Sequence, residues 1–276
     1  YILYFFIKTI NYFYKKITNK SLNTYIKDLV ERDSYKKITI LNKQIFFFSP
    51  NEITEFRVNT LFKKEPETIN WINNFKKEKT VFWDIGANIG LYSIYAAVKN
   101  PNLEIISFEP STSNLRILSR NISINDLQER IKIYQVALSD QTNKFQMLEE
   151  SEFIEGWSMN TFGAGTDFEG KKIHSKNKYK LFGTDINFLL KNDILSIPCY
   201  IKIDVDGIEH LILKGGSEFL KNPKIESILI EINENYKSQY ENTLEIMKEN
   251  KFKFMKKDFV GSKKFPKNFN YIFQKI

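Results

Sequence analysis

The chain has 276 residues, a formal net charge of +8 and one cysteine, Cys199. Its hydrophobic (42%) and charged (27%) fractions are typical of a folded domain, which excludes a disordered chain, a low-complexity array and a multi-enzyme polypeptide. A single cysteine cannot form an intramolecular disulfide, so we expect a reducing, cytoplasmic location. The basic excess lies at both ends, since residues 1–30 carry five Lys against one acid and residues 248–276 carry nine Lys against two acids. It indicates either an anionic partner or a solvated lysine-rich surface.

Residues 1–14 form an apolar, aromatic run that Lys15 and Lys16 end. This run is shorter than the roughly 20 residues of a membrane-spanning helix, and no alanine precedes Ala87, so a secretory signal peptide is not expected. A helical wheel places six apolar side chains on one face: Leu3, Phe6, Ile7, Ile10, Phe13 and Tyr14. We expect this face to be covered by the rest of the protein, by a second copy, or by an anionic membrane to which the protein is peripheral.

The next segment predicts a small hairpin followed by helix. Residues 38–41 and 44–48 are rich in β-branched and aromatic side chains and flank a two-residue turn at Asn42-Lys43. Residues 52–78 have a helical pattern. We predict an N-terminal extension over residues 1–78 and the main domain over residues 79–276.

From residue 81 onward, short apolar runs alternate with amphipathic stretches. The predicted strands contain VFWDIGA, EIISFEP, IKIYQVALSD, CYIKIDVDG and ESILIEIN, and predicted helices lie at 91–99, 113–125, 185–190, 208–220 and 239–249. This alternation predicts an α/β fold, a doubly wound parallel sheet with helices on both faces. FKFMKKD and NYIFQK, with no helix between them, predict a terminal antiparallel pair. Between residues 140 and 183 we predict one extra strand, KFQMLEE, and otherwise loop, including EGWSMNTFGAG as a lid or substrate wall.

The segment Asp84–Gly90 leaves the first of these strands and opens a helix. Small residues there allow a ligand to approach the backbone and the free N–H groups of the helix. Glu109 ends the next strand, where its carboxylate can accept the two hydroxyls of a ribose. Asn88 stands at the position of the second glycine in the dinucleotide-binding fingerprint. The carboxylate of Asp84 would repel a pyrophosphate but would suit an ammonium group. These residues favour S-adenosylmethionine over a nicotinamide cofactor.

Several separated motifs resemble the FkbM family of S-adenosylmethionine-dependent methyltransferases. They are VFWDIGANIGLYS, SFEPSTSNLRILSRNISIN, VALSD, YIKIDVDGIEHLILKGG and ILIEIN, in matching order from about Glu65 to Asn233. The resemblance implies the seven-stranded Rossmann-like methyltransferase sheet, mostly parallel with an antiparallel last strand. It also implies methyl transfer to oxygen, commonly on a sugar or natural-product hydroxyl.

The resemblance also implies residue roles. Residues of the first loop would hold the methionine half of the cofactor: Asp84, Gly86, Ala87, Asn88 and Gly90. Glu109 would bind the ribose, Val136 and Ala137 would lie near the adenine, and Asp204 would face the sulfonium. The family usually has Glu at the position of Asp206, so this chain has a carboxylate one methylene shorter there. Gly156 and Ser158 match the family's substrate loop only loosely.

Methyl transfer to an alcohol requires alignment of the oxygen with the activated carbon and removal of a proton. Four candidates for this chemistry follow the fourth strand of the main domain: Asp204, Asp206, Glu209 and His210. A divalent metal held by Asp204, Asp206, Glu231 and Asn233 is the second, less favoured route. Lys202, inside a buried strand pattern, should pair with one of these carboxylates.

The sequence therefore predicts an S-adenosylmethionine-dependent O-methyltransferase acting on a carbohydrate or glycolipid hydroxyl. Two alternatives stay open. A nucleic-acid methyltransferase would use the positive charge, but DVDG stands where a Pro-Pro-aromatic motif is typical, so a nucleic-acid partner is not favoured. A non-catalytic protein that binds a membrane surface or a partner would use both basic ends but has no need of the cofactor loop. An oxidoreductase is the least favoured.

Overall fold

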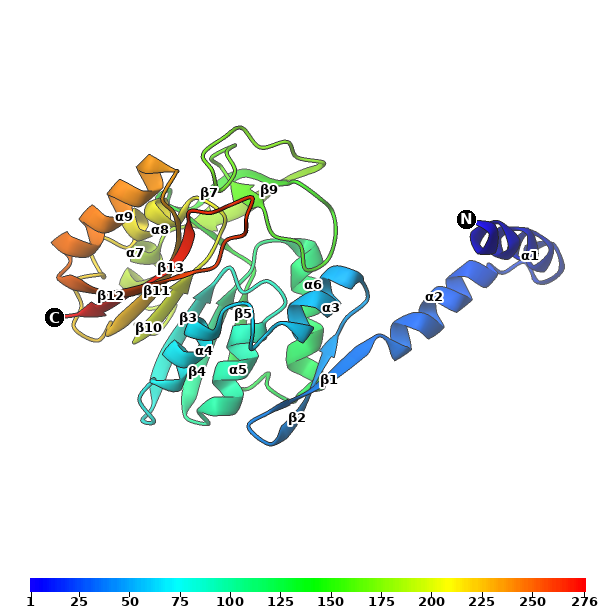
Figure 1. Cartoon of the computed structure of the whole chain (residues 1–276), viewed down its shortest axis with the longest axis horizontal. Helices are drawn as coiled ribbons and strands as arrows, with labels where there is room; N and C mark the ends of the chain where they lie inside the picture. The colour runs from blue at the N-terminus through cyan, green and yellow to red at the C-terminus, as the bar shows by residue number, and fades with distance from the viewer.

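A seven-stranded sheet forms the centre of the structure, a computed structural model that describes residues 1–276 (Figure 1). The strand order is β12-β13-β11-β10-β3-β4-β5. The strands are β3 (Thr80–Ile85), β4 (Leu103–Phe108), β5 (Ile131–Tyr134), β10 (Tyr200–Ile203), β11 (Ser227–Asn233), β12 (Phe252–Phe259) and β13 (Asn268–Lys275). Five neighbouring strands, from β11 to β5, are parallel, and β13 is antiparallel to both of its neighbours. The predicted doubly wound sheet with an antiparallel last strand is confirmed.

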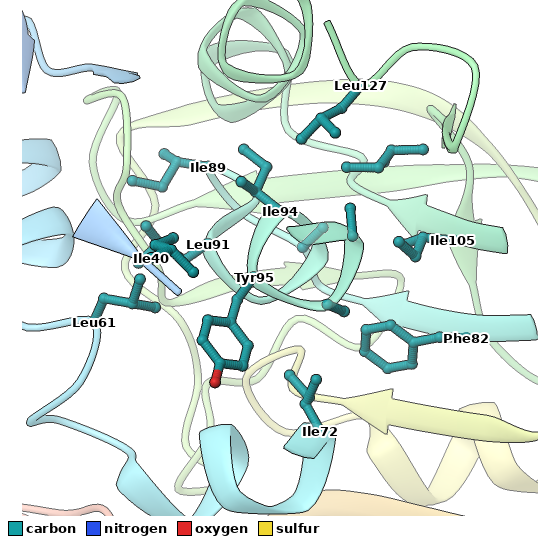
Figure 2. Close-up of a cluster of buried hydrophobic side chains, with 14 of the residues drawn as sticks. Ile40, Leu61, Ile72, Phe82, Ile89, Leu91, Ile94, Tyr95, Ile105 and Leu127 are labelled. Carbon is teal, nitrogen blue, oxygen red and sulfur yellow. The ribbon is translucent and has the colours of Figure 1, made fainter. Parts of the chain in front are cut away.

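Helices cover both faces of this sheet because its strands are apolar on both sides. Alternate residues of β3 point to opposite faces, so that Phe82 belongs to one core cluster and Trp83 to the other. The helices against the first cluster are α4 (Pro66–Asn73), α5 (Leu91–Lys99) and α6 (Thr112–Ile124). The helices against the second are α7 (Ile186–Lys191), α8 (Glu209–Gly215) and α9 (Lys237–Glu249). Figure 2 shows the first cluster, in which Ile94 and Tyr95 of α5 lie among Ile72, Phe82 and Ile105.

The predicted hairpin is present, with its turn one residue earlier than expected. Strands β1 (Tyr35–Ile40) and β2 (Lys43–Phe48) pair so that Ile40 faces Lys43, which leaves Leu41 and Asn42 as the turn, both with positive φ. The backbone N–H of Phe48 donates to Asn121 Oδ1 of α6 at 2.7 Å. This contact joins the hairpin to the domain, and Ile40 and Phe47 are fully buried in its core.

The helix predicted over residues 52–78 is two helices, α3 (Glu52–Asn59) and α4. Pro66 occupies the first position of α4, where its missing N–H costs nothing, and it cannot continue a preceding helix. Residues 40–75 contribute side chains to the same core as the sheet. The division of the chain at residue 78 stays a prediction, while the segment that projects from the core is α1 (Ile2–Thr18) and α2 (Leu22–Asp33) (Figure 1).

A second, four-stranded sheet has the order β6-β9-β7-β8. Its strands are β6 (Ala137–Leu138), β7 (Lys144–Glu150), β8 (Asn160–Phe162) and β9 (Asn177–Thr184). The extra strand expected at residues 144–150 is confirmed, but the expectation of loop over residues 177–183 was wrong. Tyr179 and Leu181 pack on the second core cluster while Lys178 and Lys180 face outward, and this period-two pattern stabilises a strand. The strand predicted over residues 131–140 divides between β5 and β6.

Candidate active site

The site begins at the loop that follows β3. Gly86 and Gly90 both have φ of +84°, and Gly90 is the N-cap residue of α5. A Cβ on Gly86 would lie 1.9 Å from the carbonyl oxygen of Asp204, so the loop touches the backbone that follows β10. Only glycine permits both this conformation and this approach. The predicted cofactor loop therefore lies against the segment DVDG, as the parallel order of β3 and β10 requires.

The side chain of Asp84 lies beneath this loop rather than in a cavity. It is buried, and its Oδ2 accepts a hydrogen bond of 2.5 Å from Ser93 Oγ. Burial raises the pKa of Asp84, while nearby Lys202 and the Ser93 bond lower it. Neither Asp84 nor Gly90 is among the residues that line the cavities beside the loop. The prediction that these two residues contact the cofactor stays a prediction, and in this structure they support the loop from below.

Glu109 occupies the predicted position at the carboxyl end of β4. Its Oε2 accepts the backbone N–H of Asn88 at 2.7 Å, and its Oε1 accepts that of Ser111 at 2.9 Å. Burial raises the pKa of Glu109 to about 7, although these N–H bonds oppose the shift. The carboxylate therefore links the first loop to the segment after β4, and each oxygen keeps a lone pair for a further donor.

A cavity of about 860 Å³, open to solvent, lies at the carboxyl ends of β3, β4 and β10. This volume includes open solvent at the mouth of the cavity. Of the predicted cofactor contacts, six line this cavity: Gly86, Asn88, Glu109, Val136, Ala137 and Asp204. Another predicted contact, Ala87, lines a smaller adjoining cavity of about 440 Å³. The larger one is called the main cavity and the smaller one the side cavity.

The main cavity has an apolar part and a polar part. Apolar side chains from both sheets and from α8 line one part: Phe108, Leu138, Leu148, Phe162, Ile208 and Ile212. In the polar part, the side-chain oxygens of Asn88 and Asn160 are buried and have no hydrogen-bond partner in the protein. Buried acceptors without partners are costly unless a ligand donates to them. This composition fits a ligand with a flat apolar ring and several hydrogen-bond donors.

Acidic and basic groups meet where the two cavities join. Lys202 is buried, and its Nζ lies 2.7 Å from Asp204 Oδ2. Desolvation alone would raise the pKa of Asp204, but Lys202 outweighs it and holds the pKa low. For Asp206, desolvation and the neighbouring charge of Asp204 raise the pKa to about 6. Asp206 has φ of +63°, and its Oδ2 accepts the backbone N–H of Met159 at 2.7 Å.

Two of the four predicted catalytic residues do not reach the cavities. The carboxylate of Glu209 accepts the backbone N–H groups of Val205 and Gly207, so it holds the shape of the DVDG loop. His210 is buried on α8, with its ring edge-on to Tyr236, and burial lowers its pKa. The catalytic roles of Glu209 and His210 stay predictions, and neither residue lines the cavities. The main cavity is instead lined by Ile208, which immediately precedes α8, and by Ile212, one turn later.

Three charged residues at the cavities were missed by the sequence interpretation. Arg57 and Lys64, before and after the turn that follows α3, line both cavities, and Glu65 lines the side cavity. Arg57 Nε donates to the carbonyl oxygen of Gly156. No local pattern signalled these residues, because they precede the first cofactor motif and reach it only through the packing of α3.

The segment predicted as a substrate wall is held over the first loop. The carbonyl oxygen of Trp157 accepts hydrogen bonds from the side-chain amides of Asn88 and Asn114, each 3.0 Å long. Ser158 lines the main cavity, and Gly156, with φ of +81°, lies behind it against Thr54. This segment closes one side of the main cavity.

A third cavity, called the outer cavity, adjoins the main cavity and has a volume of about 1,190 Å³ with open solvent included. Four residues line both of them: Lys64, Ser158, Asp206 and Glu231. Four phenylalanines give the outer cavity its walls: Phe56, Phe168, Phe259 and Phe265. Glu231 lies at the junction, where burial and the charge of Asp204 raise its pKa well above its usual value.

Three of the four predicted metal ligands, Asp204, Asp206 and Glu231, line the main cavity, but they do not form a metal-binding cluster. The structure contains no group of three or more His, Cys, Asp or Glu side chains arranged to hold a metal ion. Asn233, one of the proposed ligands, instead donates its side-chain amide to the carbonyl oxygen of Phe168. These contacts give no support to the metal route.

This sheet order, with a glycine loop after its first parallel strand and a cavity above Glu109, defines the class of Rossmann-like methyltransferases. A family model described as the methyltransferase FkbM domain matches residues 84–254. The chain belongs to this FkbM methyltransferase family.

Individual relatives match less of the chain. Methyltransferase sdnD of Sordaria araneosa is 45% identical over 56 residues, which are 20% of this chain and 22% of sdnD. The crystal structure of an FkbM methyltransferase from Methylobacillus flagellatus is 14% identical, with a TM-score of 0.48 over 79% of this chain and 52% of that one. Precorrin-6y C5,15-methyltransferase of Geobacter metallireducens is 15% identical, with a TM-score of 0.46 over 89% of this chain and 96% of that one. We draw nothing about substrate from these likenesses.

Proposed function

We propose that the chain is an S-adenosylmethionine-dependent O-methyltransferase that methylates a hydroxyl of a carbohydrate or glycolipid. The observation that carries the cofactor part is Glu109, a buried carboxylate that ends the second parallel strand and lines the main cavity. A carboxylate in that position suits the two adjacent hydroxyls of a ribose. A nicotinamide dinucleotide would bring a pyrophosphate to a site that already holds Asp204, Asp206 and Glu109, which is electrostatically unfavourable.

The remaining cofactor contacts follow from the lining of the cavities. Val136 and Phe162 line the main cavity with apolar side chains, which suits an adenine ring. The side cavity carries both signs of charge, from Arg57 and Lys64 and from Glu65 and Asp204, which suits the carboxylate and the ammonium of a methionine moiety. When bound, S-adenosylmethionine would supply an activated methyl group.

The acceptor part of the proposal is supported by the outer cavity. Aromatic faces such as those of Phe259 and Phe265 pack well against the C–H face of a sugar ring, while the carboxylates of Asp206 and Glu231 accept its hydroxyls. The charge of Asp206 opposes a phosphate backbone, which disfavours nucleic acid at this opening. A non-catalytic binding protein would have no need of the unpartnered acceptors of Asn88 and Asn160 in the main cavity.

Asp206 is the proposed general base. It lines both the main and the outer cavity, and the bond from Met159 fixes its orientation. A pKa of about 6 leaves most of the carboxylate ionised at neutral pH, yet basic enough to take a proton from a hydroxyl during transfer. Asp204 is less suited to this role, because Lys202 holds its pKa low.

Asp206→Asn should lower kcat by about 10²–10⁴-fold, the usual contribution of a general base. The assay follows transfer of labelled methyl from S-adenosylmethionine to a panel of methyl glycosides. In the wild type, kcat should rise as pH increases through about 6, because the base must be ionised, and the variant should lose this limb. Asp193→Asn, at an exposed left-handed position that Asn tolerates, serves as the control and should leave kcat unchanged. Full activity in Asp206→Asn would place the base elsewhere.

A further inference from the structure

The N-terminal arm, defined as α1 and α2, exposes a continuous apolar stripe. No residue of α1 is buried. Five apolar side chains spaced three or four residues apart form the stripe: Leu3, Phe6, Ile10, Phe13 and Ile17. Their exposed fractions run from 40% for Ile10 to 84% for Ile17. A contiguous apolar surface of this kind is uncommon on a soluble domain unless it binds something.

The rest of the protein leaves this stripe uncovered. The partly buried residues of α1 are Ile7, Asn11 and Tyr14, a different stripe of the same helix. Asn11 Oδ1 accepts the backbone N–H of Leu22 at 2.7 Å, which fixes α2 against that side. Figure 1 shows both helices extending away from the sheet and its flanking helices. No residue of 1–276 therefore covers the stripe.

The arm is basic on its polar side, where Lys8 and Lys15 lie on the face of α1 opposite the stripe and Lys16 on its flank. Five lysines precede the first acid of the chain, Asp28: Lys8, Lys15, Lys16, Lys20 and Lys27. Lys15 and Lys16 form the last turn of α1. Basic residues beside an aromatic apolar face complement a surface that is anionic outside and apolar below.

We propose that α1 lies in the interfacial region of an anionic lipid bilayer, with the stripe buried and the lysines at the headgroups. Tyr and Phe are common at this depth because their rings tolerate the polar boundary. No helix of the structure has the length and apolar character needed to cross a bilayer, which agrees with a helix that lies along the surface. This binding is independent of the acceptor proposed above.

The test is flotation of the full-length protein with vesicles of phosphatidylcholine alone or of phosphatidylcholine with phosphatidylglycerol. The wild type should bind the anionic vesicles at least about tenfold more tightly than the neutral ones, and high salt should weaken this binding. Phe6→Glu/Phe13→Glu should bind at least about tenfold more weakly. Lys15→Glu/Lys16→Glu should lose about fivefold for each lysine removed.

The matched control is Phe145→Glu, which changes a phenylalanine that is 70% exposed on β7. It should bind like the wild type. Equal binding of the wild type and Phe6→Glu/Phe13→Glu would overturn the proposal. A second result would also overturn it: light scattering finds a dimer of the wild type, the wild type does not bind vesicles, and Phe6→Glu/Phe13→Glu is a monomer. A second copy would then cover the stripe.

Discussion

Lys202→Met should lower the free energy of unfolding by about 3–5 kcal/mol, the usual cost of removing one partner of a buried ion pair. The Lys202 side chain is 1% exposed, lies 2.7 Å from Asp204 and stands 5.1 Å above the ring of Tyr92. Burial alone would lower the pKa of Lys202, but Asp204, Asp84 and Glu65 together raise it. The variant leaves these carboxylates without their shared cation.

Urea denaturation measures this loss. Lys132→Met on β5 is the matched control, because Lys132 is 54% exposed and pairs with Glu104 at the surface, so its loss should stay below about 1 kcal/mol. Lys202→Met/Asp204→Asn should recover part of the cost of the single variant, since fewer charges are then buried unpaired. If Lys202→Met and Lys132→Met lose the same stability, the buried pair does not hold this end of the sheet together.

Gly86→Ala should cost about 2–5 kcal/mol of stability and should remove cofactor binding. The added Cβ meets the carbonyl oxygen of Asp204 at 1.9 Å, and the backbone has φ of +84°. The backbone carbonyl of Asp204 cannot move aside as a flexible side chain can. The loop that follows β3 and the DVDG loop must therefore separate. This separation moves Asn88 and Asp206, which line the main cavity.

Gly165→Ala provides the control for the conformational part of this cost. Gly165 has φ of +67°, but its added Cβ meets only Glu149 Oε2 at 3.6 Å. Its cost should therefore be about 1–2 kcal/mol, from the left-handed conformation alone. Denaturation and binding of S-adenosylhomocysteine are measured for both variants. A Gly86→Ala protein as stable as Gly165→Ala would mean that the close approach to Asp204 is absent.

Local patterns predicted the sheet and the positions at its carboxyl edge. The apolar strands and the glycine loop identify where β3 ends, and Glu109 follows because the next strand must end at the same edge. The other residues of the site depend on tertiary packing, which local sequence patterns do not predict. Ile208 and Ile212 line the main cavity, whereas His210 packs edge-on against Tyr236, and the sequence alone does not fix which side of α8 is turned to the cavity. Arg57 reaches the cavity through α3, far from any motif.

Calorimetric titration with S-adenosylhomocysteine tests the cofactor claim most directly, with NAD titrated in parallel. The product should bind and NAD should not. Ribose hydroxyls donate best to ionised Glu109, whose pKa in the free protein is about 7. Affinity should therefore rise about tenfold between about pH 6 and about pH 8, since binding at lower pH must first remove the proton. Glu109→Gln should bind more weakly, by about 1–3 kcal/mol, and should lose this pH dependence. Binding of NAD alone, or an unchanged affinity and pH profile in Glu109→Gln, would contradict the account.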